Sequence, residues 1–244
     1  MFEERMIELK HRLIVTIDGP AGTGKSSVAR DLAAALSLEF LDTGAMYRAA
    51  TALALDAGVP VDDEHAVSRL VRRADLRFDW SDDPPRLYAA GRDMTERIRD
   101  ADVNAHVSIV ASLPEVRTVL VEAQRRIGEA HPFLVSEGRD QGSVVFHDAR
   151  VKFFLDASVE VRARRRAAQL REMGRHDEAD EAKIAAQIAG RDRIDSTRAV
   201  GPLCCPSDAQ RLDTSDLSQR QVVEALLERV RAAVPERVPQ GAGA

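Results

Sequence analysis

Residues 19–26 have the residue types and the spacing of a phosphate-binding loop. The segment reads GPAGTGKS and fills all four specified positions of the pattern G-x-x-x-x-G-K-[S/T]. Glycines allow backbone angles that are closed to other residues, so successive N–H groups can turn toward a phosphate. The expected chemistry is binding of ATP, with these contacts: Gly19, Pro20, Ala21, Gly22, Thr23, Gly24, Lys25, Ser26 and Ser27.

Two side chains of this loop are expected to have separate roles. Lys25 would reach the β- and γ-phosphates, and the hydroxyl of Ser26 would bind Mg²⁺. The N-terminus of a following helix adds partial positive charge at the same point. We therefore expect Mg²⁺ as the cofactor, with Ser26 as the protein ligand.

The segments on either side of the loop predict the elements that the motif requires. Residues 13–18 (LIVTID) form a short apolar run typical of a buried strand. Residues 27–36 are rich in helix formers, with apolar residues at helical spacing. Strand, glycine loop and helix follow one another as expected.

The rest of the chain continues to alternate between strands and helices. Further strands are expected at 38–41, 132–136, 151–155 and 210–213. Helices are expected at 43–57 (with Thr43 as N-cap), 100–112, 114–130, 159–172, 178–197 and 218–233. This order predicts an α/β fold of the P-loop NTPase type, a parallel sheet flanked by helices. Ligands should gather at the carboxyl ends of its strands.

Residues 62–99 interrupt this alternation. A surface helix at 64–73 is followed by expected strands at 76–80 and 86–90, with turns at 81–85 and 91–93. We predict a small inserted subdomain with an antiparallel meander. Residues 1–61 and 100–244 would then form the core, with a lid at about 165–185 and a disordered tail from Pro235.

Composition limits the class of protein. The chain has 244 residues, 44% of them hydrophobic and 31% charged, with a net charge of −5. The negative charge argues against a general nucleic-acid binder, and no segment is apolar enough for a signal peptide or a membrane span. The only two cysteines, Cys204 and Cys205, are adjacent and suggest neither disulfides nor a zinc site. We expect a cytoplasmic monomer.

Five motifs, which cover nearly the whole chain in order, resemble those of bacterial cytidylate kinases. They are IDGPAGTGKS at 17–26, LDTGAMYR at 41–48, EGRDQGSVVF at 137–146, KFFLDAS at 152–158 and RDRIDSTRAV at 191–200. The resemblance implies transfer of the γ-phosphoryl group of ATP to CMP or dCMP, giving ADP and CDP or dCDP. The acceptor is a phosphate oxygen, largely ionised at neutral pH, so no general base is required.

The resemblance also implies roles for the arginines. Arg48, Arg139, Arg191 and Arg198 would surround the acceptor phosphate and the transferring group, with Lys25, Arg139, Arg191 and Arg198 as the catalytic set. Arg191, Asp195 and Arg198 are spaced to share one helix face, which on spacing alone favours a solvated salt-bridge face. Arg165, in the basic run 162–166, resembles a lid arginine over the ATP phosphates.

Base recognition is likewise implied by the resemblance. Asp140 would accept the N4 amine of cytosine, and Ser108 and Arg117 would meet the acceptor edge of the base. Thr43, Tyr47 and Asp195 would position the ribose and the nucleotide. Thr43 could instead be only a helix cap, Tyr47 only packing and Ser108 only a surface residue.

Two points stay open at the level of sequence. Glu137 and Asp156 both end apolar strands, and either could help order metal-bound water, so neither is assigned to the metal. The chain also departs from the family pattern at several positions. Thr43 stands where many relatives carry Ser, and Ile194 and Ser196 lie in a segment that is often more basic in relatives.

Other functions compete with this interpretation. A kinase for another nucleoside monophosphate or for shikimate would share the loop and sheet. A GTPase would need an N-K-x-D motif, which does not occur. A non-enzymatic ATP-binding regulator would bind nucleotide without turnover, and it would leave the arginines unexplained.

Overall fold

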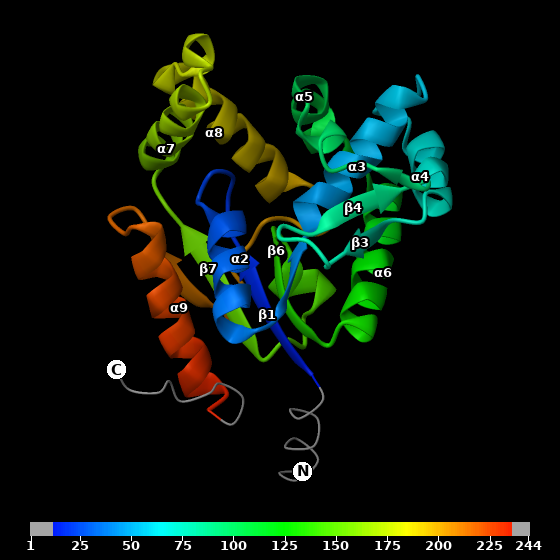
Figure 1. Cartoon of the computed structure of the whole chain (residues 1–244). Coiled ribbons are helices and arrows are strands. Elements are labelled where there is room, and N and C mark those ends of the chain that lie inside the picture. Colours follow the sequence, from blue (N-terminus) through cyan, green and yellow to red (C-terminus); the bar gives the residue numbers. More distant parts are fainter. Residues whose placement is uncertain (1–11, 236–244) are drawn as a thin grey trace.

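The centre of the molecule is a five-stranded parallel sheet with strand order β2-β6-β1-β7-β8 (Figure 1). The computed structural model describes residues 12–235. The strands are β1 (Leu13–Asp18), β2 (Glu39–Asp42), β6 (Phe133–Gly138), β7 (Val151–Asp156) and β8 (Gln210–Asp213). The predicted α/β class with a parallel sheet is confirmed. The predicted disordered tail lies outside the described residues, apart from Pro235.

The carboxyl ends of these strands line up at one edge of the sheet. Asp18 lies opposite Gly138 on β6 and Phe154 on β7, and Asp42 lies opposite Glu137. Because the strands are parallel, the loops that follow them open at the same edge. The polar motifs of the sequence are therefore gathered there.

Helices cover both faces of the sheet (Figure 1). They include α2 (Lys25–Leu36) and α9 (Gln219–Ala233) on one face, and α6 (Pro114–Ala130) on the other. The alternation of side chains along β1 explains this arrangement, since Ile17 packs with Leu32 of α2, whereas Ile14 packs with Leu120 of α6. A strand buried on both faces is apolar throughout, as the sequence of β1 is.

The insertion forms a separate antiparallel sheet beside α3 (Thr43–Asp56). Its strands are β3 (Arg77–Asp79), β4 (Arg86–Ala89) and β5 (Arg92–Asp93). The two predicted strands are present but shorter, and the predicted turn at 91–93 is wrong in part, because Arg92 pairs with Ala89 as a third strand. Leu87 and Ala89 bury their side chains against alanines of α3, which attaches this sheet to the core.

Helix α4 (Glu64–Arg73) packs differently from the small sheet. Its buried Val67 and Val71 join the apolar cluster that contains Val116 and Leu120 of α6. The helix therefore contacts the core, although it precedes the meander in sequence. The limits 62–99 for the inserted subdomain stay a prediction.

A pair of packed helices stands above the carboxyl edge, at the upper left of Figure 1. They are α7 (Val159–Glu172) and α8 (Glu181–Thr197), joined by a 3₁₀ turn, η3 (His176–Glu178). Ala163, Ala167 and Ile184 are among the buried residues between them. Helix α8 begins at 181 instead of 178 because Asp180 caps it, accepting the N–H groups of Ala182 and Lys183.

Three further elements complete the fold. Helix α5 (Ala101–Val110) follows a 3₁₀ turn, η1 (Arg97–Arg99), and packs on α3. Residues Gln141–Val145 form a π-helical turn, η2, which the sequence did not predict. This turn directly follows β6, so it belongs to the edge where the ligand site was expected.

Candidate functional site at the carboxyl edge of the sheet

The loop 19–24 joins β1 to α2 as the motif requires. Gly24 precedes the first residue of α2 and has a φ of 86°, in the left-handed region that favours glycine. The ammonium group of the buried Lys25 donates to the Pro20 carbonyl at 2.6 Å and to the Thr23 hydroxyl at 3.3 Å. Burial lowers the pKa of Lys25 to about 7, and the positive charge of Arg139 is the second cause. Lys25 is thus held inside the loop with little solvation.

Ser26 is paired with an acid that the sequence left unassigned. Its hydroxyl donates to Oε1 of Glu137 at 2.7 Å, and Glu137 is 4% exposed at the end of β6. Burial raises the pKa of Glu137. Two adjacent oxygen donors of this kind suit a hard divalent cation. Asp156, the other candidate, instead pairs with Arg211 and accepts the N–H of Ala157.

The loop after β6 carries the expected base-reading residue. The carboxylate of Asp140 forms a buried ion pair with Arg117 of α6, and Nη2 of Arg198 lies 3.7 Å from Oδ1. Arg117 also donates from Nη1 to the carbonyl of Ala111 at 3.0 Å. The structure therefore brings together two members of the expected base-reading set, Asp140 and Arg117.

Arginines gather next to this pair around one carboxylate. Arg139 donates from Nε to Asp195 at 2.9 Å, and Nη1 of Arg198 lies 3.6 Å from the same side chain. Arg191 is half-buried, and its buried Nε makes no hydrogen bond. Burial lowers the pKa of Arg191, and the nearby Arg139 is the second cause. One acid thus faces several cations, so the cluster favours an anionic ligand.

The expectation that Arg191, Asp195 and Arg198 share one helix face is wrong in one respect. Helix α8 ends at Thr197, and Arg198 has an extended backbone with a ψ of 146°. Its Nε donates to the carbonyl of Gly201 at 2.6 Å, and the chain folds back so that the side chain still reaches Asp195 and Asp140. These contacts are buried, unlike those of a solvated salt-bridge face.

Helix α3 presents three expected site residues. Thr43 is not the N-cap, because Asp42 takes that role by accepting the N–H of Ala45 at 2.8 Å. The Thr43 hydroxyl donates to the carbonyl of Glu137 at 2.7 Å. The ring of Tyr47 stacks 5.3 Å from the guanidinium of Arg117, and burial raises the pKa of Tyr47 to about 12. Tyr47 is therefore a neutral phenol beside the base-reading pair.

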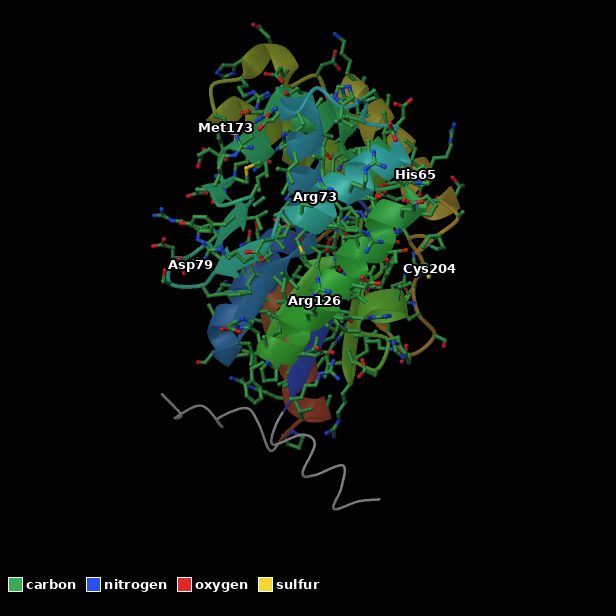
Figure 2. All side chains as sticks on the ribbon, turned by 90° about the vertical axis from the view of Figure 1, so that its right-hand side faces the viewer. His65, Arg73, Asp79, Arg126, Met173 and Cys204 are labelled. Carbon is green, nitrogen blue, oxygen red and sulfur yellow. The ribbon has the colours of Figure 1, made fainter. Side chains whose placement is uncertain are left out.

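Arg48 and Ser108 lie nearer the surface. Arg48 pairs with Asp42 at 2.9 Å, both partly exposed. A cavity of about 490 Å³ extends from Asp42 and Arg48 to Leu87 of the insertion and to Met173 at the end of α7. In Figure 2, Met173 lies on the same side of the molecule as Asp79, which belongs to the insertion, and Cys204 lies on the opposite side. Ser108 is half-buried on α5.

The structure does not bring Arg165 to the P-loop. Its guanidinium donates to the carbonyls of Thr214 and Leu217, at 2.5 and 3.1 Å. Arg162, one turn earlier, is the arginine that contacts the loop, donating to the carbonyl of Ala21 at 2.8 Å and to Asp192 at 2.6 Å.

The two residues that hold Ala21, Arg162 and Asp192, were not predicted as site residues from the sequence. Asp192 of α8 also accepts the N–H of Ala21 at 3.2 Å, so Ala21 is bound through both its backbone groups. The signal available was weak, because Arg162 is one of four arginines in five residues and Asp192 lies between two arginines. Only the packing of α7 on α8 selects them.

Residues 12–235 contain no group of three or more His, Cys, Asp or Glu side chains placed to hold a metal ion. None of their helices has the length and hydropathy needed to cross a membrane. Cys204 and Cys205 are both free and exposed.

Comparison with known proteins points to a single family. The family model for cytidylate kinase matches residues 15–232. The chain is 46% identical over 219 residues to a cytidylate kinase of Mycobacterium avium, covering 90% of this chain and 95% of that protein. It is 42% identical over 217 residues to one of Caldanaerobacter subterraneus, covering 89% and 94%.

A third relative has a second activity in its name. The chain is 47% identical over 219 residues to the bifunctional pantoate ligase/cytidylate kinase of a Synechococcus strain. The match covers 88% of this chain and 40% of that longer protein.

Proposed function

The chain belongs to the cytidylate kinase family, and we propose that it transfers the γ-phosphoryl group of ATP to CMP or dCMP, releasing ADP and CDP or dCDP. The observation that carries this proposal is the buried Asp140–Arg117 pair beside the arginine cluster, at the same edge of the sheet as the P-loop. In this proposal Asp140 and Arg117 would read the base and the arginine cluster would bind the acceptor phosphate, at the same edge of the sheet as the ATP site.

The donor side would use the P-loop. Its backbone N–H groups and Lys25 would hold the phosphates of ATP. Ser26 would bind Mg²⁺ and Glu137 would hold metal-bound water, which the 2.7 Å contact between their oxygens supports. When bound, the ion neutralises charge on the β- and γ-phosphates. Arg162 and Asp192, which hydrogen-bond to Ala21, would keep it in place when the loop is occupied.

The acceptor side would use the arginines. An ionised phosphate oxygen of CMP is itself the nucleophile, so the protein has to align two mutually repelling anions and stabilise the transferring group. Arg139, Arg191 and Arg198 would supply that charge. Arg139 and Arg198 both contact Asp195, and Arg198 also lies 3.7 Å from Asp140. Arg48, paired with Asp42, would complete the acceptor phosphate site.

Selection of cytosine would depend on hydrogen-bond donors and acceptors. Asp140 would accept the N4 amine, while Arg117, with Ser108, would donate to N3 and O2. Uracil would turn an oxygen toward Asp140 and leave buried polar groups unpaired, at a cost of roughly 1–3 kcal/mol. Tyr47, Thr43 and Asp195 would position the ribose. We also propose that the protein works as a monomer, because one chain supplies every group named here, and that it works in the cytoplasm, where its nucleotide substrates would be found.

The experiment that tests this function is ADP release from Mg·ATP with CMP, dCMP, UMP, AMP and shikimate as separate acceptors. Strong turnover with CMP and dCMP alone is expected. Turnover with another acceptor would keep phosphoryl transfer and overturn the base-reading assignment. Binding of ATP without turnover on any acceptor would leave the ATP-binding regulator as the better description.

A further inference from the structure

The side chain of Asp18 joins two loops of the site that are far apart in sequence. Asp18 ends β1 immediately before the P-loop and is 1% exposed. Its Oδ1 accepts the N–H of Gln141 at 2.8 Å, and its Oδ2 accepts the N–H of Gly142 at 2.7 Å. The segment 139–142, which carries Arg139 and Asp140, is therefore bonded directly to the strand that leads into the P-loop.

The carboxylate is energetically expensive where it lies. Burial is the largest cause that raises the pKa of Asp18 to about 7, although both backbone hydrogen bonds act in the opposite direction. Within the described part of the chain, both of its hydrogen bonds come from backbone N–H groups. An apolar side chain would avoid the desolvation cost, but it would leave two buried donors unsatisfied. The carboxylate thus stabilises the conformation of the segment 139–142 by accepting two of its backbone N–H groups.

Gln141 extends this connection to the acceptor side. Its side chain is fully buried, accepts the Ser136 hydroxyl at 2.9 Å and donates to the Thr43 hydroxyl at 3.3 Å. The same residue is therefore bonded through its backbone to Asp18 and through its amide to α3. Displacement of Gln141 would move Asp140 and Thr43 together.

We propose that Asp18 is a positioning residue for phosphoryl transfer, which holds the segment 139–142 against β1 so that the acceptor groups keep their place relative to the P-loop. The proposal rests on the proposed function for the identity of the acceptor. Asp18 itself would touch neither substrate and would act through Arg139 and Asp140. In-line transfer is sensitive to such placement, because a misplacement of about 1 Å can cost on the order of 100-fold in rate.

The first test replaces Asp18 with asparagine, which has nearly the same shape but only one acceptor oxygen. One of the two N–H groups, of Gln141 or Gly142, would then face an amide donor. We expect Asp18→Asn to raise KM for CMP about tenfold and to lower kcat, while the Kd of Mg·ATP changes less than about twofold. Unchanged kcat and KM for CMP, or a loss of ATP affinity as large as the loss for CMP, would overturn the proposal.

A matched control makes the same substitution at a remote acid. Asp63 also accepts a backbone N–H, that of Ala66 at 2.9 Å, as the exposed N-cap of α4. Asparagine is an equally good N-cap, so Asp63→Asn should leave both substrates unaffected.

A second measurement needs neither turnover nor a variant. Amide hydrogen exchange of the wild-type protein should show the N–H groups of Gln141 and Gly142 exchanging at least tenfold more slowly than exposed loop amides. Exchange as fast as that of such loops would contradict the proposal. Because this readout is independent of the acceptor, absence of CMP turnover with protected amides would overturn the proposed function and not the bonding role of Asp18.

Discussion

The carboxylate of Asp140 pairs with the guanidinium of Arg117 where neither side chain is more than 3% exposed. Gly201 lies directly against this pair, with its carbonyl bonded to Arg198. Removing one partner of a buried ion pair leaves the other charge uncompensated, which costs about 3–5 kcal/mol in typical proteins. Substrate recognition and folding stability are therefore both sensitive to changes around Asp140.

Substitution of Asp140 by asparagine should affect CMP far more than ATP. The amide has one acceptor oxygen and no charge, so Arg117 loses its ionic partner and must share the remaining oxygen with the N4 amine. We expect KM for CMP to rise at least tenfold, with the Kd of ATP changed less than about twofold. Equal loss of both, measured by initial rates and calorimetry, would mean that Asp140 is structural. Asp148→Asn, at an exposed ion pair with Arg12, is the control.

Substitution of Gly201 by alanine should damage the same site from the other side. Gly201 has a φ of 57°, and a Cβ there would collide with Asp140 Oδ2 and Arg117 Nη2. We expect Gly201→Ala to lower the free energy of unfolding by roughly 1–3 kcal/mol and to raise KM for CMP. Gly190 lies inside α8 with open space around it, so Gly190→Ala should stabilise by about 0.5–1 kcal/mol. If Gly201→Ala is as stable and active as wild type, the segment after Arg198 does not pack on the pair.

Substitution of Glu137 by glutamine should change the metal requirement. Loss of the carboxylate beside Ser26 removes the group that would hold metal-bound water. The Mg²⁺ concentration for half-maximal activity should rise about 10–100-fold. Asp156→Asn, which alters the other strand-end acid, should have a much smaller effect. The opposite order in a Mg²⁺ titration at fixed ATP would reassign the acid to Asp156.

The contacts of α7 can be separated by two matched substitutions. Arg162→Lys should weaken ATP binding about tenfold, because one ammonium cannot replace bonds to Ala21, Ala157 and Asp192 together. Arg165→Lys should have a smaller effect, since that guanidinium bonds to Thr214 and Leu217. A larger loss with Arg165→Lys, in direct measurements of ATP affinity, would support the lid role implied by the family resemblance.

The raised pKa of Asp18 predicts a change of stability with pH. The pKa is about 7 in the folded protein and 3.8 as the ordinary value, so between these limits the folded state binds more protons. The stability that this extra proton binding contributes is fully present below pH 3.8 and is lost as pH rises through 7. Relative to wild type, Asp18→Asn should become progressively more stable from pH 4 to 7, by at most about 1.4 kcal/mol per pH unit. A constant difference in urea unfolding across this range would contradict the assignment.

Much of the architecture could be predicted from local sequence. The P-loop between strand 13–18 and its helix, and the order of strands along the chain, depend on side-chain periodicity and on residues close together in sequence. The short paired strand at Arg92–Asp93 and the π-helical turn at Gln141–Val145 were not predicted, because neither has a periodic apolar pattern of its own.

The partners of the charged residues were decided by tertiary structure. The sequence left Glu137 and Asp156 equivalent, and both β6 and β7 lie beside β1. The side chain of Glu137 on β6 reaches Ser26, whereas that of Asp156 on β7 pairs with Arg211. The family resemblance named Arg165 as a lid arginine and left Arg162 without a role, whereas the packing of α7 against α8 brings Arg162 to the P-loop. Asp18 and Gly142 are 124 residues apart, and they meet because parallel strands end at the same edge. A charged side chain selects its partner by distance in space, which strand order and helix rotation determine and local residue pattern does not.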